Sequence, residues 1–119
     1  MKVGIVILFV KDVARSKKFY TEVVELSVDE QQSNADFVTL KSEGTLLALQ
    51  NAARLPASQP HQPPSSVEIG FNVDGVDAIY KRWKEAGAEI VLGPEDRPFG
   101  RYFVARDPDG HYLDVFGKQ

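Results

Sequence analysis

The chain has 119 residues, of which 43% are apolar and 26% are charged, so we expect one soluble domain with a substantial core. Fourteen basic and seventeen acidic residues give a net charge of −3 without a basic cluster, which argues against a nucleic-acid partner. The absence of cysteine excludes disulfides, thiolate metal sites and a cysteine nucleophile. The apolar opening, residues 3–10, is too short to span a membrane and lacks a signal-peptide pattern, so we expect a cytoplasmic protein with no membrane partner.

The first half of the chain predicts one strand, one helix and three further strands. Residues 3–10 are almost entirely apolar, which is typical of a strand buried on both faces. Asp12 is a candidate helix N-cap, and apolar residues follow at helical spacing as far as Glu25 or Leu26. Strand-like runs then follow at residues 27–32, 36–41 and 45–51.

Residues 52–66 differ in composition from the rest of the chain. They hold four of the seven prolines, among alanine, serine and glutamine, which is typical of a linker with polyproline II tendencies. We therefore place the boundary between two modules here, with module 1 at residues 1–51 and module 2 at residues 67–119 of a single domain.

The second half repeats the order of the first. Residues 67–73 predict a strand, Asp74 a second N-cap, and the following apolar spacing a helix that stops at Gly87. Trp83 falls on the apolar stripe of that helix, so we expect it in the core. Strand-like runs follow at residues 88–92, 101–106 and 111–117, and the repeated order indicates an internal duplication.

Aligning the two halves superposes Ile5 on Glu68 and Ala48 on Asp114. Because side chains alternate along a strand, the alignment also predicts which residues share a face. If the modules curl around one cup, one wall is largely apolar and consists of Ile5, Ile7, Phe9, Leu46, Ala48 and Gln50. The other wall is polar and aromatic and consists of Glu68, Asn72, Tyr112, Asp114 and Phe116. Such a cavity suits an amphipathic ligand with a cationic or hydrogen-bond-donating end.

The last predicted strand places Asp114 between Tyr112 and Phe116 on one face. A buried carboxylate without a partner is costly, so Asp114 needs a reason to be there. One reading is structural: Glu68 and Asp114 hydrogen-bond to the backbone or to Arg101, Arg106 or Tyr112. The other is functional: they bind a polar or cationic ligand, or act as general acid and base with pKa values pushed apart by their proximity.

Residues 94–100, just before a strand of the polar wall, have two readings. They are either a solvated turn or a lid from which Arg97 and Phe99 reach a ligand. His61 and His111 are expected at the surface rather than in a catalytic site.

Three features together resemble the vicinal oxygen chelate superfamily, which includes glyoxalase I, bleomycin-resistance proteins, fosfomycin-resistance enzymes, methylmalonyl-CoA epimerase and extradiol dioxygenases. They are the repeated modules, the run from Val10 to Tyr20, and the segment from Gly100 to Asp114 with its Asp107-Pro108-Asp109-Gly110 turn. The resemblance implies an α+β fold in which two βαβββ modules form curved mixed sheets around a cup, with helices outside. It also implies a homodimer.

Enzymes of this superfamily hold a divalent metal on up to four side chains, from the first and last strands of each module. The matching positions here are Ile5, Ala48, Glu68 and Asp114, and the first two have no donor atom. Zinc, nickel and iron sites normally use imidazole or more donors than two carboxylates. The resemblance therefore implies no cofactor and no tight metal, and a divalent metal held by Glu68 and Asp114 is the alternative.

The leading hypothesis is a metal-independent small-molecule binding protein of the bleomycin-resistance type. The alternative is a metal-dependent lyase, isomerase or dioxygenase, in which Glu68 and Asp114 would be the catalytic pair. A dimerisation or regulatory domain with a vestigial cup is a third possibility. The candidate ligand-binding residues are Ile5, Ile7, Phe9, Ala48, Gln50, Glu68, Arg101, Tyr112, Asp114 and Phe116.

Overall fold

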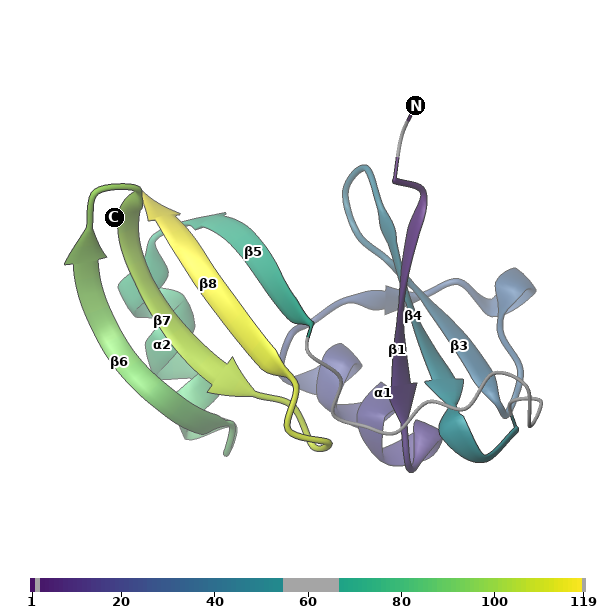
Figure 1. The fold of residues 1–119 in the computed structure, drawn as a ribbon. Helices are drawn as coiled ribbons and strands as arrows, with labels where there is room; N and C mark the ends of the chain where they lie inside the picture. Colours follow the sequence, from purple (N-terminus) through teal and green to yellow (C-terminus); the bar gives the residue numbers. More distant parts are fainter. Residues whose placement is uncertain (2, 55–66, 119) are drawn as a thin grey trace. The chain divides into compact units, whose positions relative to one another are not determined.

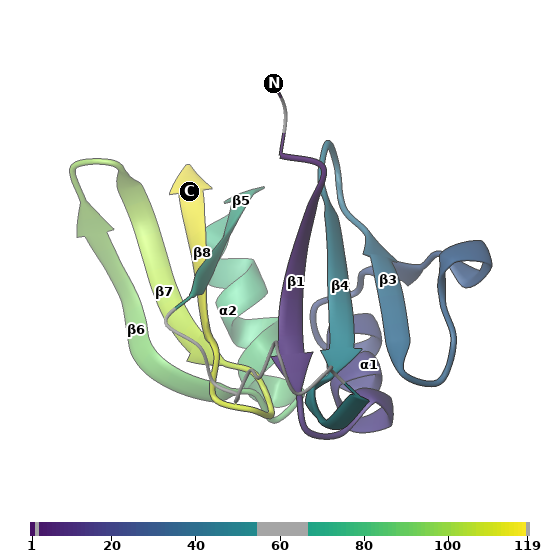
Figure 2. The same cartoon turned by 45° about the vertical axis from the view of Figure 1, so that its right-hand side comes forward.

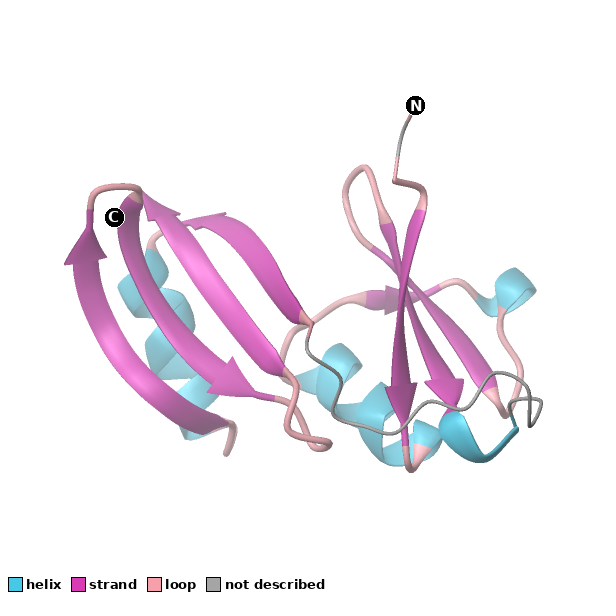
Figure 3. Cartoon of the chain, in the orientation of Figure 1, coloured by secondary structure: helices cyan, strands magenta, loops and turns pink. Residues whose placement is uncertain are grey.

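The computed structural model describes residues 1, 3–54 and 67–118 (Figure 1). The chain divides into two compact units, Met1–Ser65 and Ser66–Gln119. Each unit contains a four-stranded sheet and one α-helix (Figure 3). No helix among the described residues is both long enough and apolar enough to cross a membrane.

The first unit has the strand order β1-β4-β3-β2, with β1 parallel to β4 and the other neighbours antiparallel. Asp12 caps its helix as predicted, since its side chain accepts a hydrogen bond from the backbone N–H of Arg15. Its elements are β1 (Ile5–Val10), α1 (Val13–Glu22), β2 (Ser27–Val28), the 3₁₀ turn η1 (Glu30–Gln32), β3 (Phe37–Lys41), β4 (Leu46–Asn51) and the 3₁₀ turn η2 (Ala52–Arg54).

The second unit repeats this plan with the strand order β5-β8-β7-β6 and β5 parallel to β8. Its helix is followed by Gly87 at φ +90°, the left-handed stop that the sequence predicted. Its elements are β5 (Glu68–Asp74), α2 (Val76–Glu85), β6 (Glu89–Arg97), β7 (Gly100–Arg106) and β8 (Tyr112–Lys118).

Both units are therefore βαβββ modules, which confirms the predicted α+β fold class. The strand registers also agree with the alignment of the two halves. Ile7 pairs with Ala48 in the first sheet, and Gly70 pairs with Asp114 in the second. Ile5 and Glu68, two residues earlier, consequently occupy equivalent positions in the two modules.

The core of the second unit lies between its sheet and α2, which packs on one face of that sheet (Figures 1 and 2). Trp83 is buried and contacts the rings of Phe71 and Phe103 edge-to-face at centroid distances of 6.2 and 5.5 Å. Tyr80 contacts Phe103 in the same way at 5.4 Å. The predicted core position of Trp83 is confirmed, and aromatic packing of this kind adds to the stabilisation from burial.

Two sequence predictions in the first unit are wrong. Residues 3–10 are not buried on both faces: Leu8 and Val10 are buried, whereas Ile5 and Ile7 remain 40% and 39% exposed. The predicted strand at residues 27–32 ends after Val28, because the Asp29 side chain accepts from the Gln31 N–H and starts a 3₁₀ turn.

Two further boundaries in the second unit differ from the prediction. Asp74 is the last residue of β5, and the N-cap is Gly75 at φ +74°, which makes no side-chain cap. The predicted loop at residues 94–100 is largely strand, since β6 continues to Arg97 and β7 begins at Gly100. Of the predicted linker, Ala52–Arg54 form η2, and residues 55–66, including His61, lie outside the described residues.

Candidate functional site

The candidate site lies on the face of the second sheet opposite α2, which we call the open face. Strand alternation and register assign its residues. Gly70 lies beside Asp114, and Asn72 beside Phe116, which in turn lies beside Tyr102. The members of the open face are Glu68, Gly70, Asn72 and Asp74 on β5, Tyr112, Asp114, Phe116 and Lys118 on β8, and Tyr102, Val104 and Arg106 on β7.

Glu68 and Asp114 are brought together on this face. The pKa of Asp114 is raised to about 7, mainly by burial and then by a hydrogen bond and charge repulsion from Glu68. The Oδ1 atom of Asp114 is buried and has no hydrogen-bond partner in the part of the chain that the structure describes. Asp114 therefore still holds a proton near neutral pH, and a cation bound beside it could take the place of that proton.

Arg106 lies on the same face but is engaged by other residues. Its Nη2 donates to the Tyr112 hydroxyl at 2.8 Å, and its Cζ lies 4.9 Å from the Tyr112 ring centroid. Its Nε lies 3.7 Å from Oε2 of Glu89. This arrangement fixes the Tyr112 ring beside Asp114 and gives the open face an aromatic wall next to its carboxyl pair.

Arg101, a sequence-predicted ligand residue, is not on the open face. Its Nε donates to Oδ1 of Asp77 on α2 at 2.7 Å, and its Nη1 donates to Oδ1 of Asp96 at 3.1 Å. The prediction failed because strand alternation places Arg101 with Phe103 on the helix side of β7. Arg101 ties the helix to the sheet.

The candidate residues of the first unit lie on one face of its own sheet and are almost all apolar. Ile5, Ile7 and Phe9 alternate along β1, and Ile7 pairs with Ala48, which is fully buried. Gln50 donates from Nε2 to the backbone carbonyl of Asn51 at 3.0 Å. Apart from that amide, these side chains provide no polar group for a ligand.

The four positions at which the superfamily resemblance places metal ligands do not fit a tightly held divalent metal. Ile5 and Ala48 have no donor atom, and a metal on Glu68 and Asp114 would have to displace the proton that Asp114 holds. Among residues 1, 3–54 and 67–118, no three histidine or carboxylate side chains are gathered in a metal-binding group.

His111 is buried, although we expected it at the surface. Its Nδ1 lies 2.8 Å from Oδ2 of Asp107, and both side chains are fully buried. The other oxygen of Asp107 accepts the backbone N–H groups of Asp109 and His111. The Asp107 carboxylate thus stabilises the turn before β8. It is also the polar partner that offsets the cost of burying the imidazole.

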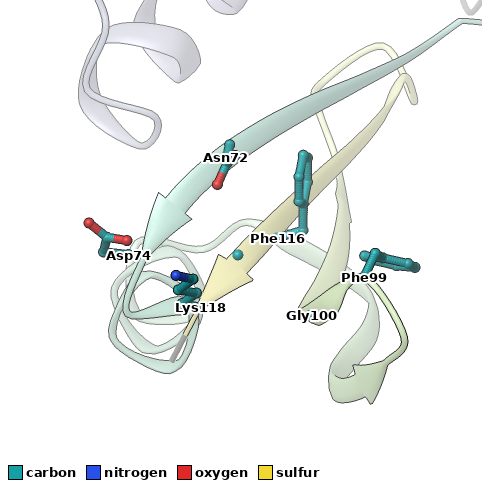
Figure 4. Close-up of a pocket in the computed structure, with 7 residues that line it drawn as sticks. Asn72, Asp74, Phe99, Gly100, Phe116 and Lys118 are labelled. Atoms are coloured by element: carbon teal, nitrogen blue, oxygen red, sulfur yellow. The ribbon is translucent and has the colours of Figure 1, made fainter.

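A pocket of about 400 Å³ lies at the far end of the open face (Figure 4). Sequence reasoning had placed Asn72 and Phe116 in a cup wall and Phe99 in a possible lid, but it missed the two glycines. A glycine inside a strand, such as Gly117, was the available signal, because it often marks a close approach of backbone. The lining residues are Asn72, Asp74, Phe99, Gly100, Phe116, Gly117 and Lys118.

The sequence family agrees with the fold. The family model described as Glyoxalase/Bleomycin resistance protein/Dioxygenase superfamily matches residues 2–115. The chain therefore belongs to this superfamily, as the motif and the repeated modules indicated.

Two curated relatives are similar to the chain over part of their own length. The anthracycline biosynthesis protein DnrV of Streptomyces peucetius is 29% identical over 90% of this chain and 43% of its own length. The metallothiol transferase FosB of Shouchella clausii is 34% identical over 60% of this chain and 51% of its own length. The chain thus spans about half or less of the length of these relatives.

Solved structures share the fold over nearly the whole chain. TnmS3, an antibiotic binding protein from Streptomyces sp. CB03234, is 26% identical with a TM-score of 0.81, covering 100% of this chain and 97% of its own. A glyoxalase-related enzyme from Fulvimarina pelagi has a TM-score of 0.84 at 22% identity, covering 98% of this chain and 88% of its own. The second likeness concerns the fold alone.

Proposed function

We propose that the chain is a metal-independent binding protein that takes a planar, amphipathic small molecule with an amine on its open face. The observation that carries this proposal is the pairing of Glu68 with Asp114 beside the Tyr112 ring. Asp114 still holds its proton near neutral pH because its pKa is raised to about 7, and a ligand ammonium can take the place of that proton.

The aromatic residues suit the body of such a ligand. Tyr112 and Phe116 flank Asp114 along β8, so a flat apolar molecule whose amine meets the carboxyl pair also meets ring surfaces. Cation–π attraction to the ring of Tyr112 adds to the attraction of the carboxyl groups for an ammonium group.

The relatives support the same ligand class. One is named for anthracycline biosynthesis and another is titled an antibiotic binding protein. An anthracycline with an amino sugar combines a planar ring system with an ammonium group, so it presents both features that the open face could recognise. We therefore choose such a compound as the probe.

The test compares an amino-sugar anthracycline with its aglycone, which keeps the rings and lacks the amine. We expect Glu68→Gln and Asp114→Asn each to weaken the amino compound about tenfold or more, because each variant removes a charge-assisted contact. Aglycone affinity should stay unchanged in both variants. Binding is measured by the ligand's own fluorescence and by calorimetry.

The matched control is Val91→Ala, which shortens an exposed apolar side chain on β6. It should bind both compounds as the wild type does. Wild-type affinity for the amino compound in both carboxyl variants would contradict the proposal, as would equal wild-type affinity for the two compounds.

A further inference from the structure

The pocket shown in Figure 4 is displaced along the sheet from the carboxyl pair. A strand advances about 3.3 Å per residue, so Asn72 lies about 13 Å along β5 from Glu68. Phe116 lies about 7 Å along β8 from Asp114 by the same spacing. The pocket is thus a separate subsite on the open face, within reach of the other end of an elongated ligand.

Backbone of two glycines forms the floor of this pocket. Gly117 has φ +150°, and a Cβ there would lie 1.9 Å from the carbonyl oxygen of Val73. Gly100 has φ +133°, and a Cβ there would lie 2.9 Å from the carbonyl oxygen of Gly117. Neither position tolerates a side chain, so only backbone atoms line the bottom of the pocket. The absence of side chains also lets β8 approach β5 and β7 closely here.

Aromatic rings form the walls. Phe99, in the turn between β6 and β7, is 63% exposed and stands edge-to-face with Phe116 at a centroid distance of 6.3 Å. It also contacts Tyr102 edge-to-face at 5.3 Å. A large aromatic side chain exposed to this degree is costly in water, and a flat ligand in the pocket would cover it.

The pocket offers one neutral polar side chain to a ligand, the amide of Asn72. Within the described residues the side-chain amide of Asn72 makes no hydrogen bond, so its donor and acceptor are both available. Its Oδ1 would lie 3.1 Å from a Cβ at Gly117, which places the amide at the glycine floor. Asp74 and Lys118 are register partners at the rim and carry opposite charges that cancel.

We propose that this pocket is a subsite for the neutral aromatic end of the ligand, with Asn72 as the residue that selects a carbonyl or hydroxyl on the ring edge. The rings of Phe99 and Phe116 supply the apolar contact, and the glycine floor admits the flat edge. The role of the subsite within a longer ligand rests on the proposed function, whereas its affinity for a neutral ring compound does not.

The experiment titrates the anthracycline aglycone into the ¹⁵N-labelled 119-residue chain. We expect the largest chemical-shift changes at the backbone amides of Gly100 and Gly117 and at the side-chain amide of Asn72. Phe99→Ala and Asn72→Ala should each weaken the aglycone roughly tenfold, from lost ring contact and a lost hydrogen bond respectively. Both side chains are exposed, so the variants should keep the wild-type spectrum elsewhere.

Val91→Ala is again the control and should leave aglycone binding unchanged. The subsite proposal is wrong if the Phe99 and Asn72 variants bind the aglycone with wild-type affinity. It is also wrong if the aglycone does not bind the wild type, or if binding changes the chemical shifts of residues outside the pocket instead. If Phe99→Ala and Asn72→Ala weaken aglycone binding while Glu68→Gln leaves the affinity for the amino compound unchanged, the proposed function is wrong and the subsite proposal is supported. If instead Glu68→Gln weakens the amino compound while the Phe99 and Asn72 variants bind the aglycone as the wild type does, the subsite proposal is wrong and the proposed function is supported.

Discussion

At the scale of single residues, the environment of Asp114 departs furthest from that of an ordinary exposed carboxylate. Its β8 position could be read from strand alternation, but its protonation depends on burial and on the neighbouring carboxyl group of Glu68. A carboxyl group that holds its proton to about pH 7 is a different ligand partner from one that ionises at its ordinary value of 3.8. From the sequence, a perturbed pKa was only one of two readings, because the sequence does not show whether Glu68 and Asp114 meet.

The raised pKa of Asp114 predicts a pH dependence of stability. Between its ordinary value of 3.8 and about 7 the folded state binds more protons than the unfolded state. The free energy of unfolding should therefore fall as pH rises through that interval and level off above it. Asp114→Asn should remove this part of the fall, which urea titrations at a series of pH values would show. Parallel curves for the variant and the wild type would contradict the assignment.

The same pKa predicts how ligand affinity changes with pH. As pH rises through about 7, Asp114 ionises more readily and the carboxyl pair gains negative charge. The amino-sugar compound should bind more tightly across this range, while its neutral aglycone should not. Calorimetry of both compounds at matched pH values measures the difference, and an equal pH response of the two would count against a role for Asp114.

At the scale of elements, the turn between β7 and β8 shows how the chain positions its site strand. Proline and glycine at residues 108 and 110 predicted a turn, and the structure adds the buried Asp107–His111 pair beneath it. Gly117 plays the corresponding role at the other end of β8, where it allows close approach to Val73. These contacts hold the strand that carries both Asp114 and Phe116.

We expect Asp107→Ala to destabilise the protein by about 3 kcal/mol or more, because it leaves two backbone N–H groups and the His111 ring without their buried acceptor. Urea unfolding followed by circular dichroism measures the loss. The control is Glu43→Ala, an exposed change in the first unit that should stay within about 0.5 kcal/mol. A loss for Asp107→Ala as small as that of the control would show that the network contributes little.

At the scale of the whole molecule, β1 is the outermost strand of its sheet and exposes apolar side chains. Val3, Ile5 and Ile7 are all exposed, and an apolar edge strand invites association unless another surface covers it. The homodimer implied by the superfamily resemblance stays a prediction, as do the shared cup and the cytoplasmic location. The exposed apolar side chains of the edge strand are a physical reason to expect the dimer, because a second copy would cover them.

Sedimentation equilibrium should therefore give a mass of about twice 13.2 kDa for the wild type. Ile7→Lys should shift the protein toward the monomer, because a charge on this edge opposes apolar contact with a second copy. Lys41→Ala, an exposed change on β3, is the control and should leave the mass unchanged. A wild type that sediments at the monomer mass would contradict the prediction.

Local pattern in the chain was enough to predict the duplicated βαβββ order, the Asp12 cap, the Gly87 stop and the face shared by Tyr112, Asp114 and Phe116. These features depend on short-range periodicity and local backbone preference, both of which can be recognised in the amino-acid sequence. Three features could be seen only in the folded protein: Arg101 faces α2, His111 is buried, and Gly100 and Gly117 line the bottom of a pocket. Those outcomes depend on which distant strands pair and what they bury, and local pattern does not contain that information.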